Sequence, residues 1–164
     1  METDSSGIIH RLDLKDDQTF RLGDAIDVKA SIALVVITFL ATQTGSFLSV
    51  GGRAAELPLW SAFALAIAGA LAVSELWPRD YEIEATEGLD GWIQELGDYY
   101  RHDDDADSKV AEAVRSGHIA RTKERIEANA RINQRKSVYL TWSFRFTAIA
   151  LVLNLVTLIL RAWG

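Results

Sequence analysis

The 164-residue sequence contains no cysteine, so disulfide bonds and thiolate chemistry are excluded for this chain. It contains only two prolines, Pro58 and Pro78, and neither interrupts the passage from the N-terminal segment into the first apolar run. None of the three histidines belongs to a pattern that would combine a nucleophile, a base and an orienting group. These absences predict that the protein is not an enzyme. The net charge of -6 argues against nucleic acid as a partner.

Charge is also missing from long stretches of the chain, although charged residues make up 24% of the whole. Residues 30–52 contain no charged side chain, and the next charged residue is Arg53. As a helix, this run would be about 34 Å long, which exceeds the bilayer hydrocarbon core of about 30 Å. Similar spans are predicted at about residues 57–77 and within 137–164, where the span includes Arg145. The sequence therefore predicts an all-α integral membrane protein with three transmembrane helices and a small cytoplasmic helical region.

The charged residues divide the chain around these spans. Residues 1–26 are predicted to form a cytoplasmic segment or helix that continues into the first span, and residues 27–78 contain the first two spans, at about 30–50 and 57–77. Residues 79–136 form a cytoplasmic region with an acidic half and a long basic helix, and residues 137–164 contain the third span. Lysine and arginine are concentrated in the N-terminal segment and in residues 79–136, whereas the connection between the first two spans contains only Arg53. This asymmetry predicts a multi-pass protein of the cell (inner or plasma) membrane with a cytoplasmic N-terminus and an external C-terminus.

Five polar residues recur at spacings of four or three on one face of the predicted basic helix. Arginine and asparagine supply hydrogen-bond donors suited to an anion or a base edge, whereas asparagine is a poor helix former. The face can therefore be a solvated surface, a site that binds a ligand phosphate, or a seam that fixes the register of an oligomer. The five candidate ligand-binding residues are Arg121, Arg125, Asn129, Asn133 and Lys136.

Four charged residues lie near the predicted cytoplasmic ends of the spans. Asp27 and Lys29 stand at the entry to the first span, where they either anchor the helix end in the headgroups or dock as a fixed charge pair against the cytoplasmic helices. Glu75 and Arg145 are predicted to form an ion pair between helices, with a pore mouth as the alternative. All four are candidates for gating or helix packing.

The acidic half of the cytoplasmic region offers a second kind of candidate site. His102 is followed by Asp103, Asp104, Asp105 and Asp107, but these residues are contiguous and lack the glycine and the closing glutamate of a calcium loop. A solvated loop is the preferred interpretation, and no metal site is predicted.

Two helix starts are predicted in the same region. Asp90 is predicted to cap a short helix that carries Trp92 and Leu96, and Ser108 is predicted to cap the long basic helix.

Several of these residues carry a resemblance to a known family. The motif Asp27-x-Lys29-Ala30-Ser31 at the entry to the first span, the Pro78-Arg79 exit from the second, and Lys136 near the end of the basic helix resemble the transmembrane Pycsar effectors. The order of parts also resembles that of the SLATT effectors found beside nucleotide-producing defence enzymes. The resemblance implies a membrane protein that responds to a cyclic pyrimidine mononucleotide and impairs the membrane during phage infection.

We therefore expect an antiphage-defence effector that permeabilises or depolarises the inner membrane when a cyclic nucleotide triggers it. Its expected partners are the lipid bilayer and further copies of itself, because spans with polar residues need neighbours. Apart from a cyclic mononucleotide ligand, no cofactor is expected. The alternatives are a non-enzymatic structural or regulatory subunit of a larger membrane complex and a small constitutive channel.

Overall fold

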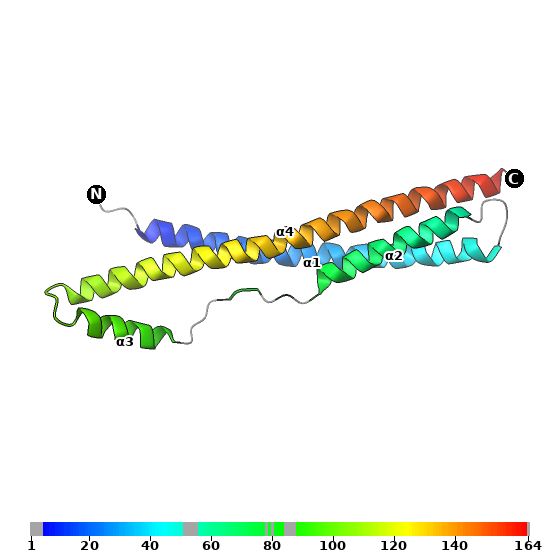
Figure 1. Ribbon diagram of the computed structural model, residues 1–164. Coiled ribbons are helices and arrows are strands. Elements are labelled where there is room, and N and C mark those ends of the chain that lie inside the picture. The colour runs from blue at the N-terminus through cyan, green and yellow to red at the C-terminus, as the bar shows by residue number, and fades with distance from the viewer. Residues whose placement is uncertain (1–4, 51–55, 78, 80, 84–87, 164) are drawn as a thin grey trace. The chain divides into compact units, whose positions relative to one another are not determined.

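The computed structural model describes residues 5–50, 56–77, 79, 81–83 and 88–163. Its helices are α1 (Ser5–Val50), α2 (Glu56–Leu76), α3 (Leu89–Tyr100) and α4 (Ala106–Ala162) (Figure 1). The described residues contain no strand, which confirms the predicted all-α class. Arg53, which follows the first charge-free run, and Pro78, at the exit of the second span, lie outside the described residues.

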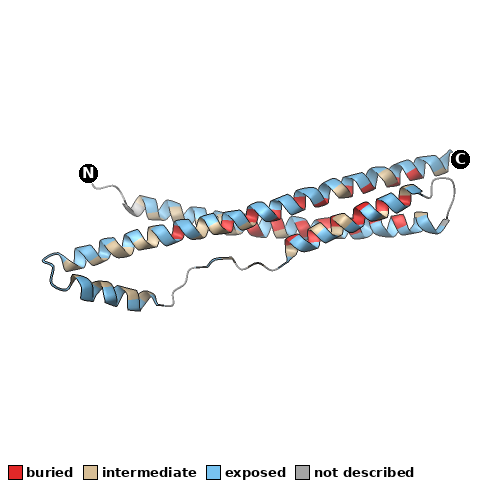
Figure 2. Ribbon diagram, viewed as in Figure 1, coloured by how far each residue is buried: buried red, intermediate tan, exposed pale blue. Residues whose placement is uncertain are grey.

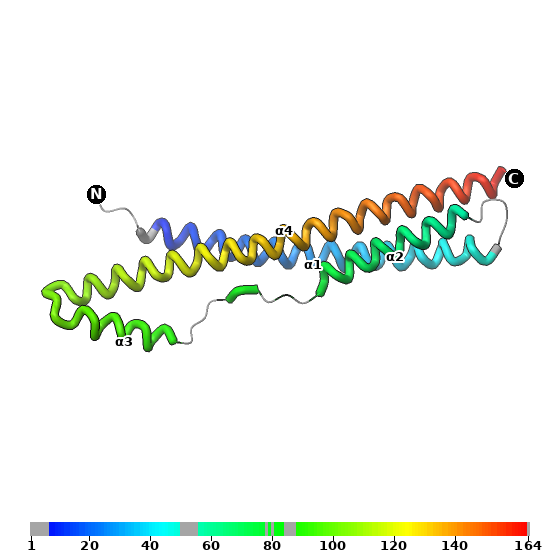
Figure 3. Tube along the Cα trace, in the orientation of Figure 1, coloured from blue at the N-terminus to red at the C-terminus, as the bar shows by residue number. Residues whose placement is uncertain are grey.

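Two helices are much longer than a membrane span. α1 contains 46 residues and α4 contains 57, and each is drawn as an unbroken helix in Figure 3. Neither contains a proline, which would remove a backbone hydrogen bond and kink the helix. The third span is thus the second part of α4 rather than a separate element. The start of this helix was predicted at Ser108, but the structure begins it at Ala106.

The chain divides into two compact units, each of which takes one part of α1 and one part of α4. The first unit consists of Met1–Arg21 and Asp80–Ile132, and the second of Leu22–Arg79 and Asn133–Gly164. α1, α2 and α4 each contain a stretch that is long and apolar enough to cross a membrane. We call the second unit the membrane unit, because most of these apolar stretches belong to it.

The membrane unit has a buried seam with a repeat of three and four residues. In α1 the seam contains Ile26, Ala30, Ala33, Ile37 and Leu40. Such a 3.5-residue repeat is typical of left-handed helix packing, in which one narrow stripe of each helix faces its neighbours. Figure 2 shows this stripe as the buried positions along the helices. Large apolar residues outside the seam, such as Val35 and Phe39, are exposed and provide the surface that lipid would cover.

The same repeat continues in α2 and α4, where small and polar residues take many of the positions. In α2 the buried positions include Ser61, Leu65, Ala68, Ala72 and Glu75. In α4 they include Leu140, Ser143, Thr147, Ala150, Asn154 and Thr157. Small residues let the helix backbones approach closely, which provides the packing contacts that stabilise helices in lipid.

The first unit contains α3, whose apolar face packs on α4. α3 begins after Gly88, which has a φ of 82° and lies in the left-handed region that glycine adopts readily. The prediction that Asp90 caps this helix was wrong, because Gly88 occupies the N-cap position and Asp90 lies in the first turn. An acidic side chain in the first turn still interacts favourably with the helix dipole.

Candidate functional site

A cavity of about 360 Å³ lies in the first unit, between α3, α4 and the segment 81–83. Its apolar lining comes from Ile83, Leu89 and Val114, and its aromatic lining from Trp92. Its charged and polar lining residues are Glu82, His118, Arg121, Thr122, Glu124 and Arg125. An apolar pocket with a few polar groups at its wall is the usual form of a small-molecule site.

Arg121 and Trp92 form the most distinctive contact of this cavity. The guanidinium carbon of Arg121 lies 4.8 Å from the centre of the Trp92 ring, which is a cation–π geometry. Arg121 remains exposed, and no carboxylate among the described residues forms an ion pair with it. Its N–H groups therefore remain able to donate hydrogen bonds to an anion at the cavity wall.

Gly117 determines how closely Trp92 can approach α4. A Cβ atom added at Gly117 would lie 2.5 Å from Cη2 and 3.2 Å from Cζ2 of Trp92. Any side chain at this position would therefore displace the indole ring. The sequence pattern does not reveal this role, because glycine within a helix is usually only a mild weakness.

We expect Gly117→Ala to weaken the packing of α3 on α4. Overpacking of this kind typically costs about 1–3 kcal/mol, which exceeds the gain of about 1 kcal/mol in helix propensity. Urea unfolding followed by tryptophan fluorescence would measure the change. Gly97→Ala is the matched control, because a Cβ there meets nothing within 4 Å. Equal stabilisation by both substitutions would contradict the close packing of Trp92.

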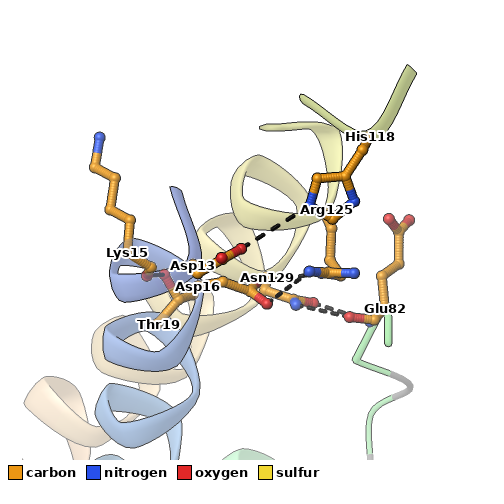
Figure 4. A network of polar contacts seen from close by, with 8 residues as sticks. All are labelled: Asp13, Lys15, Asp16, Thr19, Glu82, His118, Arg125 and Asn129. Carbon is orange, nitrogen blue, oxygen red and sulfur yellow. Dashed lines mark hydrogen bonds and ion pairs between the residues drawn. The ribbon is translucent and has the colours of Figure 1, made fainter. Parts of the chain in front are cut away.

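Asn129 makes a two-point contact with the backbone of Glu82. Its Nδ2 donates to the carbonyl oxygen of Glu82 at 2.9 Å, and its Oδ1 accepts from the N–H of Glu82 at 2.9 Å (Figure 4). Asn129 is fully buried by these contacts. Its amide thus satisfies main-chain groups of a segment that has no regular secondary structure. This contact accounts for the asparagine in the middle of the helix, and no ligand is needed to explain it.

Arg125 is held by an acidic residue of α1. Its Nε and Nη2 donate to the two carboxylate oxygens of Asp16 at 3.3 and 2.8 Å (Figure 4). The two side chains are only 11% and 15% exposed, so this bidentate pair is worth more than a surface ion pair. His118 lies 4.0 Å from Asp13 in the same unit. Asp16 of α1 is thus one partner of Arg125 among the described residues.

In the membrane unit, Lys136 pairs with Asp27. Lys136 Nζ donates to Asp27 Oδ1 at 2.6 Å, and the side chain of Lys136 is only 4% exposed. This contact supports the interpretation of Asp27 as a docking charge. Lys29, two residues later, lies on the exposed side of α1, so the two charged residues of the motif do not act together.

The predicted ion pair between Glu75 and Arg145 is wrong. Glu75 is fully buried, and neither of its carboxylate oxygens has a hydrogen-bond partner among the described residues. Arg145 is exposed, and its guanidinium carbon lies 4.7 Å from the centre of the Trp142 ring. The physical reason is the rotation of α4: its seam passes through Ser143 and Thr147, and Arg145 points away from it.

The sequence indicated that polar residues within the spans need neighbours, but it did not identify their partners, which the structure brings together in a polar cluster. Asn154 Nδ2 donates to Thr44 Oγ1 at 2.9 Å, and Thr44 Oγ1 lies 3.4 Å from Ser61 Oγ. Ser61 also donates to the carbonyl oxygen of Ala150 at 3.2 Å, and Ser143 donates to that of Ala68 at 2.8 Å. The 3.5-residue repeat in α4 was the signal that could have revealed this cluster.

Among the described residues, the acidic loop forms one side-chain ion pair. Lys109 Nζ donates to Asp103 Oδ2 at 2.7 Å, and this hydrogen bond raises the pKa of Lys109. Among the residues that the structure describes, no three histidine or carboxylate side chains are placed to hold a metal ion.

The five predicted ligand residues are thus distributed between different environments. Arg121 and Arg125 line the cavity, whereas Asn129 binds the Glu82 backbone. Asn133 and Lys136 belong to the membrane unit and are buried. A ligand role for the set as a whole remains a prediction, and Arg121 is the member whose position suits it best.

Comparison with known proteins identifies one family. The family model described as "Pycsar effector protein domain" matches residues 16–163 of the chain. The match includes all of α2, α3 and α4 and most of α1. Neither a curated protein nor a solved structure matches the chain.

Proposed function

Since the chain belongs to the Pycsar effector family and is an antiphage-defence membrane effector, we propose that it acts by permeabilising or depolarising the cell membrane. The observation that carries this proposal is the buried polar seam of the membrane unit. Polar and charged residues inside membrane spans are costly and usually mark a functional pathway. Here they include Lys136, Glu75, Asn154 and Thr44.

The proposal includes a cytoplasmic N-terminus, for which the distribution of lysine and arginine is the support. It also includes a non-enzymatic mode of action, which the family match to an effector domain supports.

A homo-oligomer is the most economical way to form a conducting path. Asn154, Ser61 and Ser143 form hydrogen bonds with other residues of the same chain, so a path for ions is expected to require the helices of several copies. Gln43 supports this idea, because it lies within the first predicted span and on the exposed side of α1. An amide exposed to lipid lacks hydrogen-bond partners, whereas a neighbouring copy would supply them.

We expect Gln43→Leu to reduce the mass of the detergent-solubilised particle, because leucine cannot make hydrogen bonds between copies. Light scattering coupled to size exclusion would measure the protein mass. Val35→Leu, on another exposed position of α1, is the control. A Gln43→Leu protein with the mass of the wild type would remove Gln43 from the interface.

The proposed trigger is a cyclic mononucleotide that binds in the cavity of the first unit. Arg121 would donate to its phosphate, and the apolar and aromatic wall near Trp92 would contact its base. α4 lines this cavity and also carries Lys136 of the membrane unit. A change in the position of α4 would therefore affect the seam.

Expression in bacterial cells that carry a membrane-potential dye tests the function. We expect the potential to collapse only when a pyrimidine cyclase is expressed as well. Collapse without the cyclase would indicate a constitutive channel. An unchanged potential in both cases, with the protein present in the membrane, would indicate a structural or regulatory subunit instead.

A further inference from the structure

Glu75 is the one fully buried carboxylate of the membrane unit among the described residues, and both of its oxygens lack a hydrogen-bond partner there. It lies in the last turn of α2. An ionised carboxylate in such a place would be very costly, because burial removes its hydration without replacement. A buried carboxyl group to which no cation donates a hydrogen bond is therefore expected to carry a proton.

The charged groups near Glu75 indicate why the proton is expected on Glu75 and not on Asp27. Asp27 of α1, Lys136 of α4 and Arg79, just beyond α2, are the charged groups that act on Glu75. Lys136 is already bonded to Asp27 at 2.6 Å, and the Arg79 guanidinium lies 5.6 Å from the centre of the Tyr139 ring. Asp27 is also 41% exposed at its side chain, whereas Glu75 is buried. Asp27 thus already has Lys136 as its ion-pair partner, whereas no donor among the described residues bonds to Glu75.

We propose that Glu75 is a proton-binding site: it holds one proton at neutral pH, while Lys136 neutralises the ionised Asp27 beside it. The three groups then carry no net charge. Release of the proton would leave two carboxylates beside one lysine, and the repulsion between Asp27 and Glu75 would weaken the contact between α1 and α2. The ligand of this site is a proton, and the proposal is independent of the function proposed above.

Infrared spectroscopy of the full-length protein in an ester-free detergent tests the proposal directly. A protonated carboxylic acid has a C=O stretching band that is separate from the bands of carboxylates and amides. Exposed carboxyl groups, with a pKa of about 4, do not contribute to it at neutral pH. We expect this band in the wild type, and we expect it to be lost in Glu75→Gln. Glu95→Gln, on the exposed side of α3, is the control and should retain it.

A second variant distinguishes the proposed arrangement from simple burial. In Asp27→Asn, Lys136 loses its carboxylate, so Glu75 should ionise to replace it and the band should be lost. Retention of the band in Asp27→Asn would contradict the role of Lys136 in placing the proton. If Glu75→Gln does not fold, wild-type protein labelled with ¹³C-glutamate or ¹³C-aspartate assigns the band. A band that shifts with aspartate labelling, or a wild type without the band, would overturn the proposal.

Discussion

Lys136→Met is expected to lower the free energy of unfolding of the membrane unit by about 3 kcal/mol. Removing one partner of a buried ion pair typically costs about 3–5 kcal/mol, because the other charge is left unpaired. The lower end applies here, because the Asp27 side chain is 41% exposed while that of Lys136 is only 4% exposed. Methionine keeps the length and the apolar part of the side chain. Denaturant unfolding in detergent would measure the loss.

Two variants define the origin of this effect. Lys29→Met removes a lysine from the exposed side of α1 and should change the stability little. The double variant Asp27→Asn/Lys136→Met removes both charges of the pair and should recover part of the loss. A double variant as unstable as the sum of the two single variants would show that the ion pair makes no energetic contribution.

Arg121→Gln is expected to weaken the binding of a cyclic pyrimidine mononucleotide by about 10- to 100-fold. A hydrogen bond to a charged group is worth about 1.5–3 kcal/mol, and about 1.4 kcal/mol corresponds to a factor of ten in affinity. Glutamine keeps a donor but loses the positive charge. Calorimetric titration of the purified protein would measure the dissociation constant.

Arg131→Gln is the control for this measurement. Arg131 is on the same helix, its side chain is 73% exposed, and it pairs with Glu127 at 3.8 Å. The substitution removes the same charge from the chain away from the cavity, so it should leave the affinity within a factor of about two. Equal weakening by both variants would mean that the ligand responds to the general charge of the helix and not to Arg121.

The spans and the helical class could be predicted because their signals are local. The charge-free run at residues 30–52 is longer than a bilayer core is thick, and no packing information is needed to interpret it. The absence of proline from α1 likewise predicts that the helix continues from the polar segment into the span. Both features depend only on residues that are adjacent in sequence.

The partners of the polar side chains could not be predicted in this way. Asp16 with Arg125, and Asn129 with the Glu82 backbone, join residues that are 109 and 47 positions apart. Such pairs depend on which face of each helix is turned toward the other. The Glu75–Arg145 prediction considered depth along the span but not rotation, and it was wrong because Arg145 lies outside the seam.

The roles of the glycines likewise could not be predicted from the sequence. Gly117 and Gly97 look alike in sequence, since both occur inside a helix. In the structure only Gly117 has an aromatic ring against it, and only there would a Cβ collide. The cavity near Trp92 therefore requires a three-dimensional arrangement of α3 and α4 that the pattern of residues does not specify.

The most direct test of the proposed function uses only the purified protein, lipid and ligand. The protein is reconstituted into vesicles that hold a potassium-diffusion potential, and a potential-sensitive dye reports the voltage across the membrane. We predict that a cyclic pyrimidine mononucleotide collapses this potential and that the vesicles hold it without the ligand. A potential that persists after saturating ligand, with the protein correctly inserted, would contradict the proposal that this chain is itself the triggered membrane-depolarising effector.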